Sequence, residues 1–152
     1  MSTKYLEDFT VGEIIDTDPT FLSTEEIIKF AKLYDPQSFH LDPDKAISSP
    51  YNGLIASGLQ TIAVAFGQFI RLGYITESSL GGPGIDKVDW LLPVRPEDTL
   101  TTTVEVLEVR ESKTKQDRGI IRLKFLMSAN GSPAVEFIST TFLLRRHNLG
   151  VK

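Results

Sequence analysis

Residues 57–73, which read SGLQTIAVAFGQFIRLG, decide the fold of this chain. Ser57 is a favourable N-cap residue for a helix, and Gly73 is a natural helix end. The segment between them predicts a helix of roughly 16 residues, apolar nearly all round in its middle, with too little polar surface for the outside of a protein. We therefore expect it at the centre. Its predicted apolar face consists of Leu59, Ile62, Ala63, Phe66, Phe69 and Ile70.

The second half of the chain has the alternating pattern of β-strands. Val106 and Leu107 are adjacent apolar residues that shift this alternation, which indicates a bulge. Asn130 and Gly131 are a strong signal for a hairpin turn. Together the strands predict an antiparallel sheet of about five strands. They are EIIDTDPTFL near 13–22, IDKVDWLL at 85–92, TLTTTVEVLEV at 99–109, IIRLKFLM at 120–127 and AVEFISTTFLL at 134–144.

A shorter amphipathic helix is predicted for residues 23–35, STEEIIKFAKLYD. Ser23 and Glu26 have the spacing of a capping box at its start, and Pro36 ends it. A sheet wrapped around the long helix is the economical way to bury the apolar faces of both. The predicted fold class is therefore α+β, with residues 1–152 as a single domain.

The composition excludes several classes of protein. The chain has 152 residues and no cysteine, which excludes a disulfide framework, a zinc ribbon and a thiol nucleophile. A net charge of −4, with scattered Lys and Arg, disfavours nucleic acid as a partner. The first residues lack the apolar core of an export signal, and no apolar run has the length that a membrane span needs. We expect a cytoplasmic protein without a membrane partner.

The chain has two histidines, and His40 lies five residues after Asp35. Side chains on opposite sides of a short loop can hold one water molecule and act on it as an acid/base pair. The residues leave a second interpretation open, because an aspartate before a proline commonly ends a helix and a buried histidine commonly finds a polar partner. His147 is expected to be solvated, and Asp42 is expected to be an N-cap.

A family resemblance rests on YDPQSFHLDPDKA at 34–46 and SPYNGLIASGL at 49–59. These runs resemble the signature of MaoC-like dehydratases and (R)-specific enoyl-CoA hydratases. The positions that match are Asp35, His40, Leu41, Asp42, Ala46 and Gly58. The similarity extends through SLGGPGIDKVDWLLPVRPEDTL at 79–100, so it covers most of the chain. It implies the hot-dog fold, a sheet rolled around one helix, which agrees with the pattern of the strands.

The resemblance also implies a function and a set of site residues. The expected reaction is the addition of water to a 2-enoyl thioester, or its removal from a 3-hydroxyacyl thioester, of coenzyme A or acyl carrier protein. Asp35 and His40 would be the acid/base pair, and the amide of Gly58 would hold the oxyanion at a helix N-terminus. Ser57 and Gln60 are candidate substrate-binding residues. No metal or other cofactor is expected, and the chain is expected to form a homodimer or a higher homo-oligomer.

The sequence leaves two alternative functions open. Thioesterases with this fold generally place an Asp or Glu on the central helix, and residues 57–72 contain neither. The other alternative is a non-catalytic subunit that binds acyl-CoA, against which the presence of both Asp35 and His40 argues. Leu59 and Gln60 stand where a similar subgroup has Trp-His, a difference that concerns the acyl pocket and not the acid/base pair.

Overall fold

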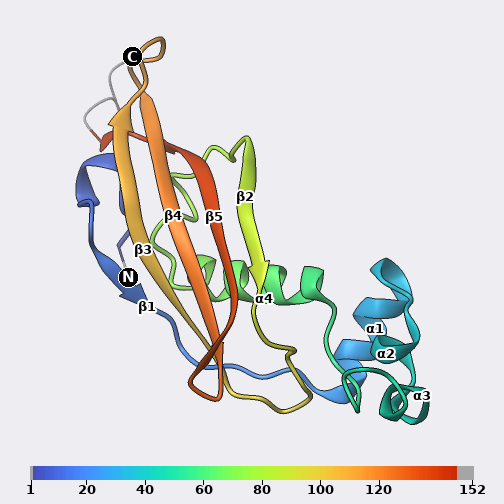
Figure 1. Cartoon of the computed structure of the whole chain (residues 1–152). Coiled ribbons are helices and arrows are strands. Elements are labelled where there is room, and N and C mark those ends of the chain that lie inside the picture. Colours follow the sequence, from blue (N-terminus) through green and yellow to red (C-terminus); the bar gives the residue numbers. More distant parts are fainter. Residues whose placement is uncertain (1, 147–152) are drawn as a thin grey trace.

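The computed structural model describes residues 2–146 and contains a five-stranded antiparallel sheet. The order of the strands across the sheet is β1-β3-β4-β5-β2, so β1 and β2 are its edges (Figure 1). The strands are β1 (Ile14–Asp16), β2 (Gly84–Trp90), β3 (Leu100–Glu111), β4 (Arg118–Ala129) and β5 (Ser132–Leu144). Five strands and their antiparallel pairing confirm the predicted α+β class.

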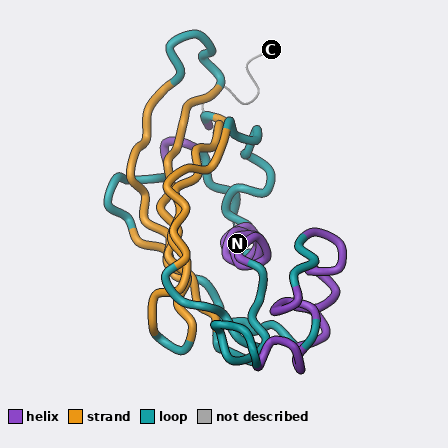
Figure 2. Tube along the Cα trace, turned by 45° about the vertical axis from the view of Figure 1, so that its right-hand side comes forward, coloured by secondary structure: helices purple, strands orange, loops and turns teal. Residues whose placement is uncertain are grey.

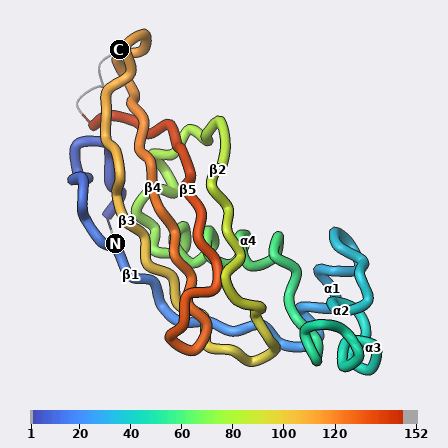
Figure 3. The backbone as a smooth tube through the Cα atoms, in the orientation of Figure 1, coloured from blue at the N-terminus to red at the C-terminus, as the bar shows by residue number. Residues whose placement is uncertain are grey.

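Local sequence explains how the three long strands are joined and shaped. The predicted bulge is present, because the register of β3 against β4 shifts between Val106 and Glu108. The predicted hairpin is also present, since Ala129 pairs with Ser132 around Asn130 and Gly131. Both turn residues have positive φ, 51° and 85°, which is the conformation that a two-residue hairpin requires. The three strands run side by side across α4 (Gly58–Ile70) (Figure 3).

Helix α4 is the predicted long helix, but the side that it buries differs from the predicted one. Its buried residues are Gln60, Thr61, Ala65, Gln68 and Phe69. Leu59 and Phe66, which were predicted to face the core, are exposed. The prediction was therefore wrong for these two residues and for the exposed Ala63, whereas Phe69 is buried and Ile62 and Ile70 pack against the core as predicted, because the sheet covers only one side of the helix. The helix begins after Ser57, as expected, and with 13 residues it ends at Ile70, before the predicted end at Gly73.

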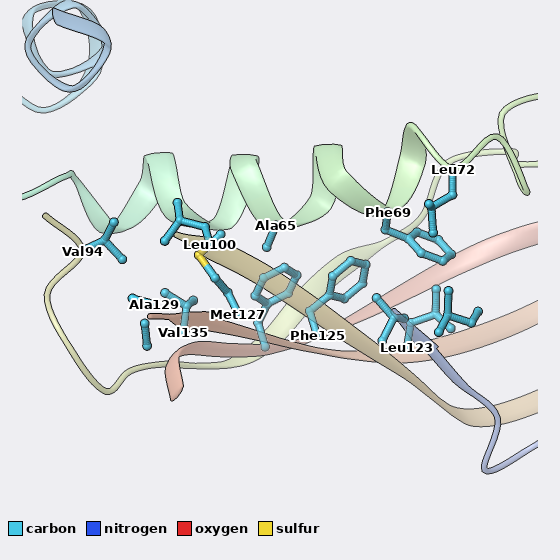
Figure 4. Packing of buried hydrophobic residues seen from close by; sticks show 14 of the residues in the cluster. Ala65, Phe69, Leu72, Val94, Leu100, Leu123, Phe125, Met127, Ala129 and Val135 are labelled. Carbon is cyan, nitrogen blue, oxygen red and sulfur yellow. The ribbon is translucent and has the colours of Figure 1, made fainter. Parts of the chain in front are cut away.

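The core lies between α4 and the sheet (Figure 4). Alternate residues are buried along β4 and the first half of β3, which is the pattern of a sheet with one buried face, whereas β5 also buries adjacent residues. Phe125 is central: its ring stacks on Phe137 at a centroid distance of 4.7 Å and meets the edge of Phe69 at 5.6 Å. The core is therefore built around three aromatic rings, one of which comes from α4.

Three short helices form a group beyond the N-terminal end of α4, apart from the sheet (Figure 2). They are α1 (Thr24–Tyr34), α2 (Ser38–Leu41) and α3 (Pro43–Ile47), and a 3-10 turn, Leu6–Asp8, precedes β1. The capping box of Ser23 and Glu26 is present, and Asp42 is the N-cap of α3. Within residues 2–146, no helix is long and apolar enough to cross a membrane. His147 lies outside the described residues.

Candidate active site

Asp35 and His40 meet where α1 gives way to α2. Asp35 is the C-cap of α1, and its amide donates to the carbonyl oxygen of Ala31. Pro36 cannot continue the helix, so the chain turns and re-enters a helical conformation in α2. Nε2 of His40 then lies 3.3 Å from Oδ2 of Asp35. The structure thus brings together the two residues that their spacing singled out.

The imidazole of His40 is oriented from its other side. Its Nδ1 lies 2.7 Å from the carbonyl oxygen of Ile55. A carbonyl oxygen only accepts hydrogen bonds, so Nδ1 carries a proton and donates it to this contact. Nε2 therefore faces Oδ2 of Asp35. Without a proton between these two atoms, the lone pair of Nε2 would point at a lone pair of the carboxylate oxygen, so the contact is favourable only when a proton lies there. The side chain of His40 is buried, which fixes the ring in this orientation.

Two neutral donors stabilise the carboxylate of Asp35. Ser57 Oγ donates to Oδ2 at 2.6 Å, and Gln37 Nε2 donates to Oδ1 at 2.7 Å. Burial raises the pKa of Asp35, but these two hydrogen bonds and the nearby His40 outweigh it, so the pKa lies below its ordinary value. Asp35 is therefore ionised at neutral pH. Of the residues expected to bind substrate, Ser57 thus contacts the catalytic candidate itself.

Gly58 begins α4 beside this pair. Ser57 is the N-cap, and its Oγ accepts the amide of Leu59 at 3.2 Å while it donates to Asp35. The amide of Gly58 makes no hydrogen bond with the described residues, as is usual for the first turn of a helix. It lies at the positive end of the helix dipole, so it can donate to an oxygen that gains negative charge.

A cavity of about 470 Å³ joins these groups. Asp35, His40 and Gly58 all line it, so the pair and the helix start border the same space. The volume falls in the range of small-molecule sites, and most of the remaining wall is apolar. That apolar wall includes Phe39, Tyr51, Ile55, Leu91 and Leu92.

Gln60 is not brought to this cavity. Its Nε2 donates to the backbone oxygen of Glu26 at 3.2 Å, so the side chain points towards α1. It lines a separate cavity of about 330 Å³ that also includes Phe30 and Arg71. Its Oε1 is buried without a hydrogen-bond partner among the described residues. A residue two positions after Gly58 on a helix projects to a different side, which explains the separation.

Sequence reasoning missed Trp90, which lines the main cavity at the end of β2. An ideal Cβ on Gly58 would lie 2.4 Å from Nε1 of this indole, so the ring edge occupies the space of the absent side chain. Trp90 is the single tryptophan of the chain, and it precedes an exposed pair, Leu91 and Leu92. Nothing in the local pattern pointed to a contact between β2 and the start of α4.

The described residues 2–146 contain no group of three or more His, Asp or Glu side chains that could hold a metal ion.

Comparison with known proteins places this geometry in a family. The family model "MaoC like domain" matches residues 8–125. YdeM, an uncharacterised protein of Bacillus subtilis, is 36% identical over 110 residues, which are 72% of this chain and 78% of YdeM. The MaoC-like dehydratase of Rhodospirillum rubrum is 30% identical, with a TM-score of 0.85 over 93% of this chain and 97% of that one. An (R)-hydratase from A. caviae involved in PHA biosynthesis is 25% identical, with a TM-score of 0.71 over 89% and 97%. With the match of the family model over most of its length, this chain belongs to the MaoC-like domain family and has the hot-dog fold.

Proposed function

We propose that this protein is a hydratase/dehydratase that adds water to a 2-enoyl thioester or removes it from a 3-hydroxyacyl thioester. The observation that carries the proposal is the Asp35–His40 pair, 3.3 Å apart, on the wall of the cavity that Gly58 also lines. Similarity to a MaoC-like dehydratase and an (R)-hydratase supports the same type of reaction. The carrier of the acyl group is proposed to be coenzyme A, with acyl carrier protein as the alternative.

The pair can handle the two protons of hydration. A water molecule beside Nε2 and Oδ2 can contact both atoms, since they are 3.3 Å apart and each hydrogen bond needs about 2.8 Å. Asp35, whose pKa is lowered, is the base that takes a proton from this water. The protonated Nε2 of His40 is the acid that delivers a proton to the α-carbon.

One turnover adds both parts of a water molecule to the substrate and leaves the pair unchanged. The oxygen of the water forms a bond with the β-carbon, while the C=C π electrons take up the proton of His40 at the α-carbon. Asp35 then holds the proton of the water and returns it to His40 across the short contact, which restores the pair. Dehydration is the same sequence in reverse.

The negative charge that develops on the thioester oxygen needs a donor. The Gly58 amide is free of other hydrogen bonds among the described residues and stands at the N-terminus of a helix of 13 residues. Glycine at this position leaves the amide accessible from the cavity side. Gly58 is therefore proposed as the oxyanion site.

Two other functions fit the same fold. A thioesterase would need an acidic nucleophile or base on α4. In this chain α4 has the sequence GLQTIAVAFGQFI, which contains no acidic residue. A non-catalytic subunit that binds acyl-CoA would not need a buried imidazole aligned on an ionised carboxylate.

Incubation of the purified protein with crotonyl-CoA, followed by mass spectrometry, tests the proposal. Hydration gives a product heavier by one water molecule, hydrolysis gives crotonic acid and free CoA, and a binding subunit leaves crotonyl-CoA unchanged. The gain of water is the expected result. Protein with both Asp35→Asn and His40→Gln is the control for hydration that does not depend on the pair.

We also propose a homodimer, joined along β2. This strand is an edge of the sheet, and an edge with exposed apolar side chains favours pairing with another chain. Ile85, Trp90, Leu91 and Leu92 are exposed on and after β2. Analytical ultracentrifugation should find a dimer, and a stable folded monomer at micromolar concentration would contradict it.

A further inference from the structure

The indole of Trp90 lies against the start of α4. An ideal Cβ on Gly58 would be 2.4 Å from Nε1, 2.5 Å from Cε2 and 3.0 Å from Cδ1 of this ring. Carbon atoms do not approach a ring so closely, so any side chain at position 58 would displace the indole. The glycine therefore has a role besides access for a substrate: it lets the N–H edge of Trp90 reach the helix start.

This contact leaves two hydrogen-bond donors unused beside one another. Nε1–H of Trp90 can only donate, and it makes no hydrogen bond with the described residues. The amide of Gly58 also makes none within them. Because Trp90 is partly exposed, its N–H is open to solvent and available to an acceptor that enters the cavity. Both residues line the cavity that contains Asp35 and His40, so an acceptor in that cavity could meet both donors.

We propose that Nε1–H of Trp90 is a second donor, beside the Gly58 amide, for the carbonyl oxygen of a bound acyl thioester. This inference rests on the proposed function. A carbonyl oxygen has two lone pairs and accepts two hydrogen bonds, and its acceptor strength grows as negative charge develops on it during hydration. Trp90 thereby becomes a catalytic residue that comes from the sheet, whereas the other catalytic candidates come from the helical segments.

The competing explanation is that the ring only closes the cavity wall. Trp90 is 54% exposed, and a large apolar surface could serve that purpose without a hydrogen bond. A phenylalanine would fill the wall in the same way but lacks the donor. The substitution Trp90→Phe therefore separates the two explanations.

The deciding measurement is the carbonyl resonance of butyryl-CoA that carries an isotopic label at the carbonyl carbon. This saturated thioester binds but cannot be hydrated, so the measurement does not depend on turnover. Two hydrogen bonds polarise the carbonyl and shift its resonance downfield on binding. The expected result is a clear shift with the native protein and a smaller one with Trp90→Phe. An equal shift in both proteins would overturn the proposal, whatever the rates of the variant.

Kinetics and fluorescence supply independent readouts. Loss of one oxyanion donor commonly lowers kcat by about 10²-fold, so Trp90→Phe should lower kcat for crotonyl-CoA with little change in KM. Tyr34→Phe, which alters an exposed ring outside the cavity, is the matched control and should leave kcat unchanged. Since Trp90 is the one tryptophan in the chain, native emission should change saturably with butyryl-CoA. Emission that stays constant while equilibrium dialysis detects binding would also overturn the proposal.

Failure of this inference can be told apart from failure of the proposed function. If native protein does not hydrate crotonyl-CoA, the hydratase proposal falls, and the carbonyl resonance still decides whether Trp90 contacts a thioester. If native protein hydrates crotonyl-CoA and Trp90→Phe matches it in both kcat and carbonyl shift, the hydratase proposal stands and the second donor falls.

Discussion

The two ends of α4 have opposite surroundings. At the C-terminal end, Ala65 and Phe69 are fully packed against the sheet, with Phe69 in edge contact with Phe125. At the N-terminal end, Gly58 and Leu59 border a cavity, and Leu59 is 52% exposed. One rigid element thus joins a close-packed region to an open one.

This difference separates stability from chemistry along a single helix. The packed end buries apolar surface and satisfies its polar groups, so substitutions there should act on the free energy of unfolding. The open end keeps an unused amide, a neighbouring indole N–H and an ionised carboxylate, so substitutions there should act on turnover. Groups held ready in this way need a rigid support, which the packed end supplies.

The acid/base pair should show the largest effect on chemistry. Asp35→Asn and His40→Gln keep the shape and polarity of each side chain, so the fold should persist. Each should lower kcat for an enoyl thioester by about 10²–10⁴-fold, the usual contribution of a positioned acid or base. Because both groups act on the same water, the double variant should lose much less than the product of the single losses.

Asp44→Asn, in an exposed part of α3, is the matched control and should leave kcat unchanged. Near-normal turnover in either single variant of the pair would show that Asp35 and His40 serve packing only.

At the packed end, Phe69→Ala should have the opposite profile. Removal of a fully buried ring costs about 3–5 kcal/mol of unfolding free energy, because the cavity cannot close completely. The fraction that remains folded should keep a kcat close to normal. Urea denaturation gives the first quantity and steady-state kinetics gives the second. A large fall in the kcat of the folded protein would contradict the proposal that the two ends of α4 serve stability and turnover separately.

Gly58→Ala tests the contact between the start of α4 and Trp90. The new methyl group collides with the indole of Trp90, and such overpacking typically costs about 1–3 kcal/mol. In a Trp90→Leu background the collision is relieved, so the same alanine should cost much less. A thermodynamic cycle over the four proteins, measured by urea denaturation, gives the coupling. Equal costs in both backgrounds would mean that the ring moves aside freely.

Ser57→Ala should have the smallest effect and a characteristic dependence on pH. Loss of the N-cap costs about 1 kcal/mol. Loss of the hydrogen bond from Oγ, which lowers the pKa of Asp35, raises that pKa, so a higher pH is needed to ionise the base. The acidic limb of the kcat/KM profile should therefore move to higher pH. An unchanged limb would indicate that Asp35 is not the base.

Local patterns were sufficient for most of the fold. Alternation predicted the strands, the adjacent Val106 and Leu107 predicted the bulge, and Asn130-Gly131 predicted the hairpin. These features depend on neighbours in the chain. The buried face of α4 was predicted only in part, since it depends on which side of the helix the sheet covers, and apolar periodicity is ambiguous when a helix is apolar nearly all round.

The site residues also fall into two groups, those that could be predicted from neighbours in the chain and those that depend on how the sheet packs on the helix. Asp35 and His40 could be paired from sequence because they are close in the chain and matched a known signature. Trp90 could not be placed beside Gly58, because that contact arises from the path of the sheet over the helix. Gln60 was assigned to the site by its closeness in sequence, yet the rotation of the helix carries it to α1.

The side-chain amide of Gln68 holds α4 in place against its neighbours. Its Nε2 donates to the backbone oxygens of Asp18 and Leu100, and its Oε1 accepts from Thr102 Oγ1, all at 2.7–3.0 Å. A slide or rotation of α4 would break all three bonds inside a buried region. Gly58 lies ten residues earlier, about 15 Å along the helix axis. Gln68 therefore fixes the position and rotation of α4, and through the rigid helix it also limits how far the amide of Gly58 can move relative to a ligand in the cavity.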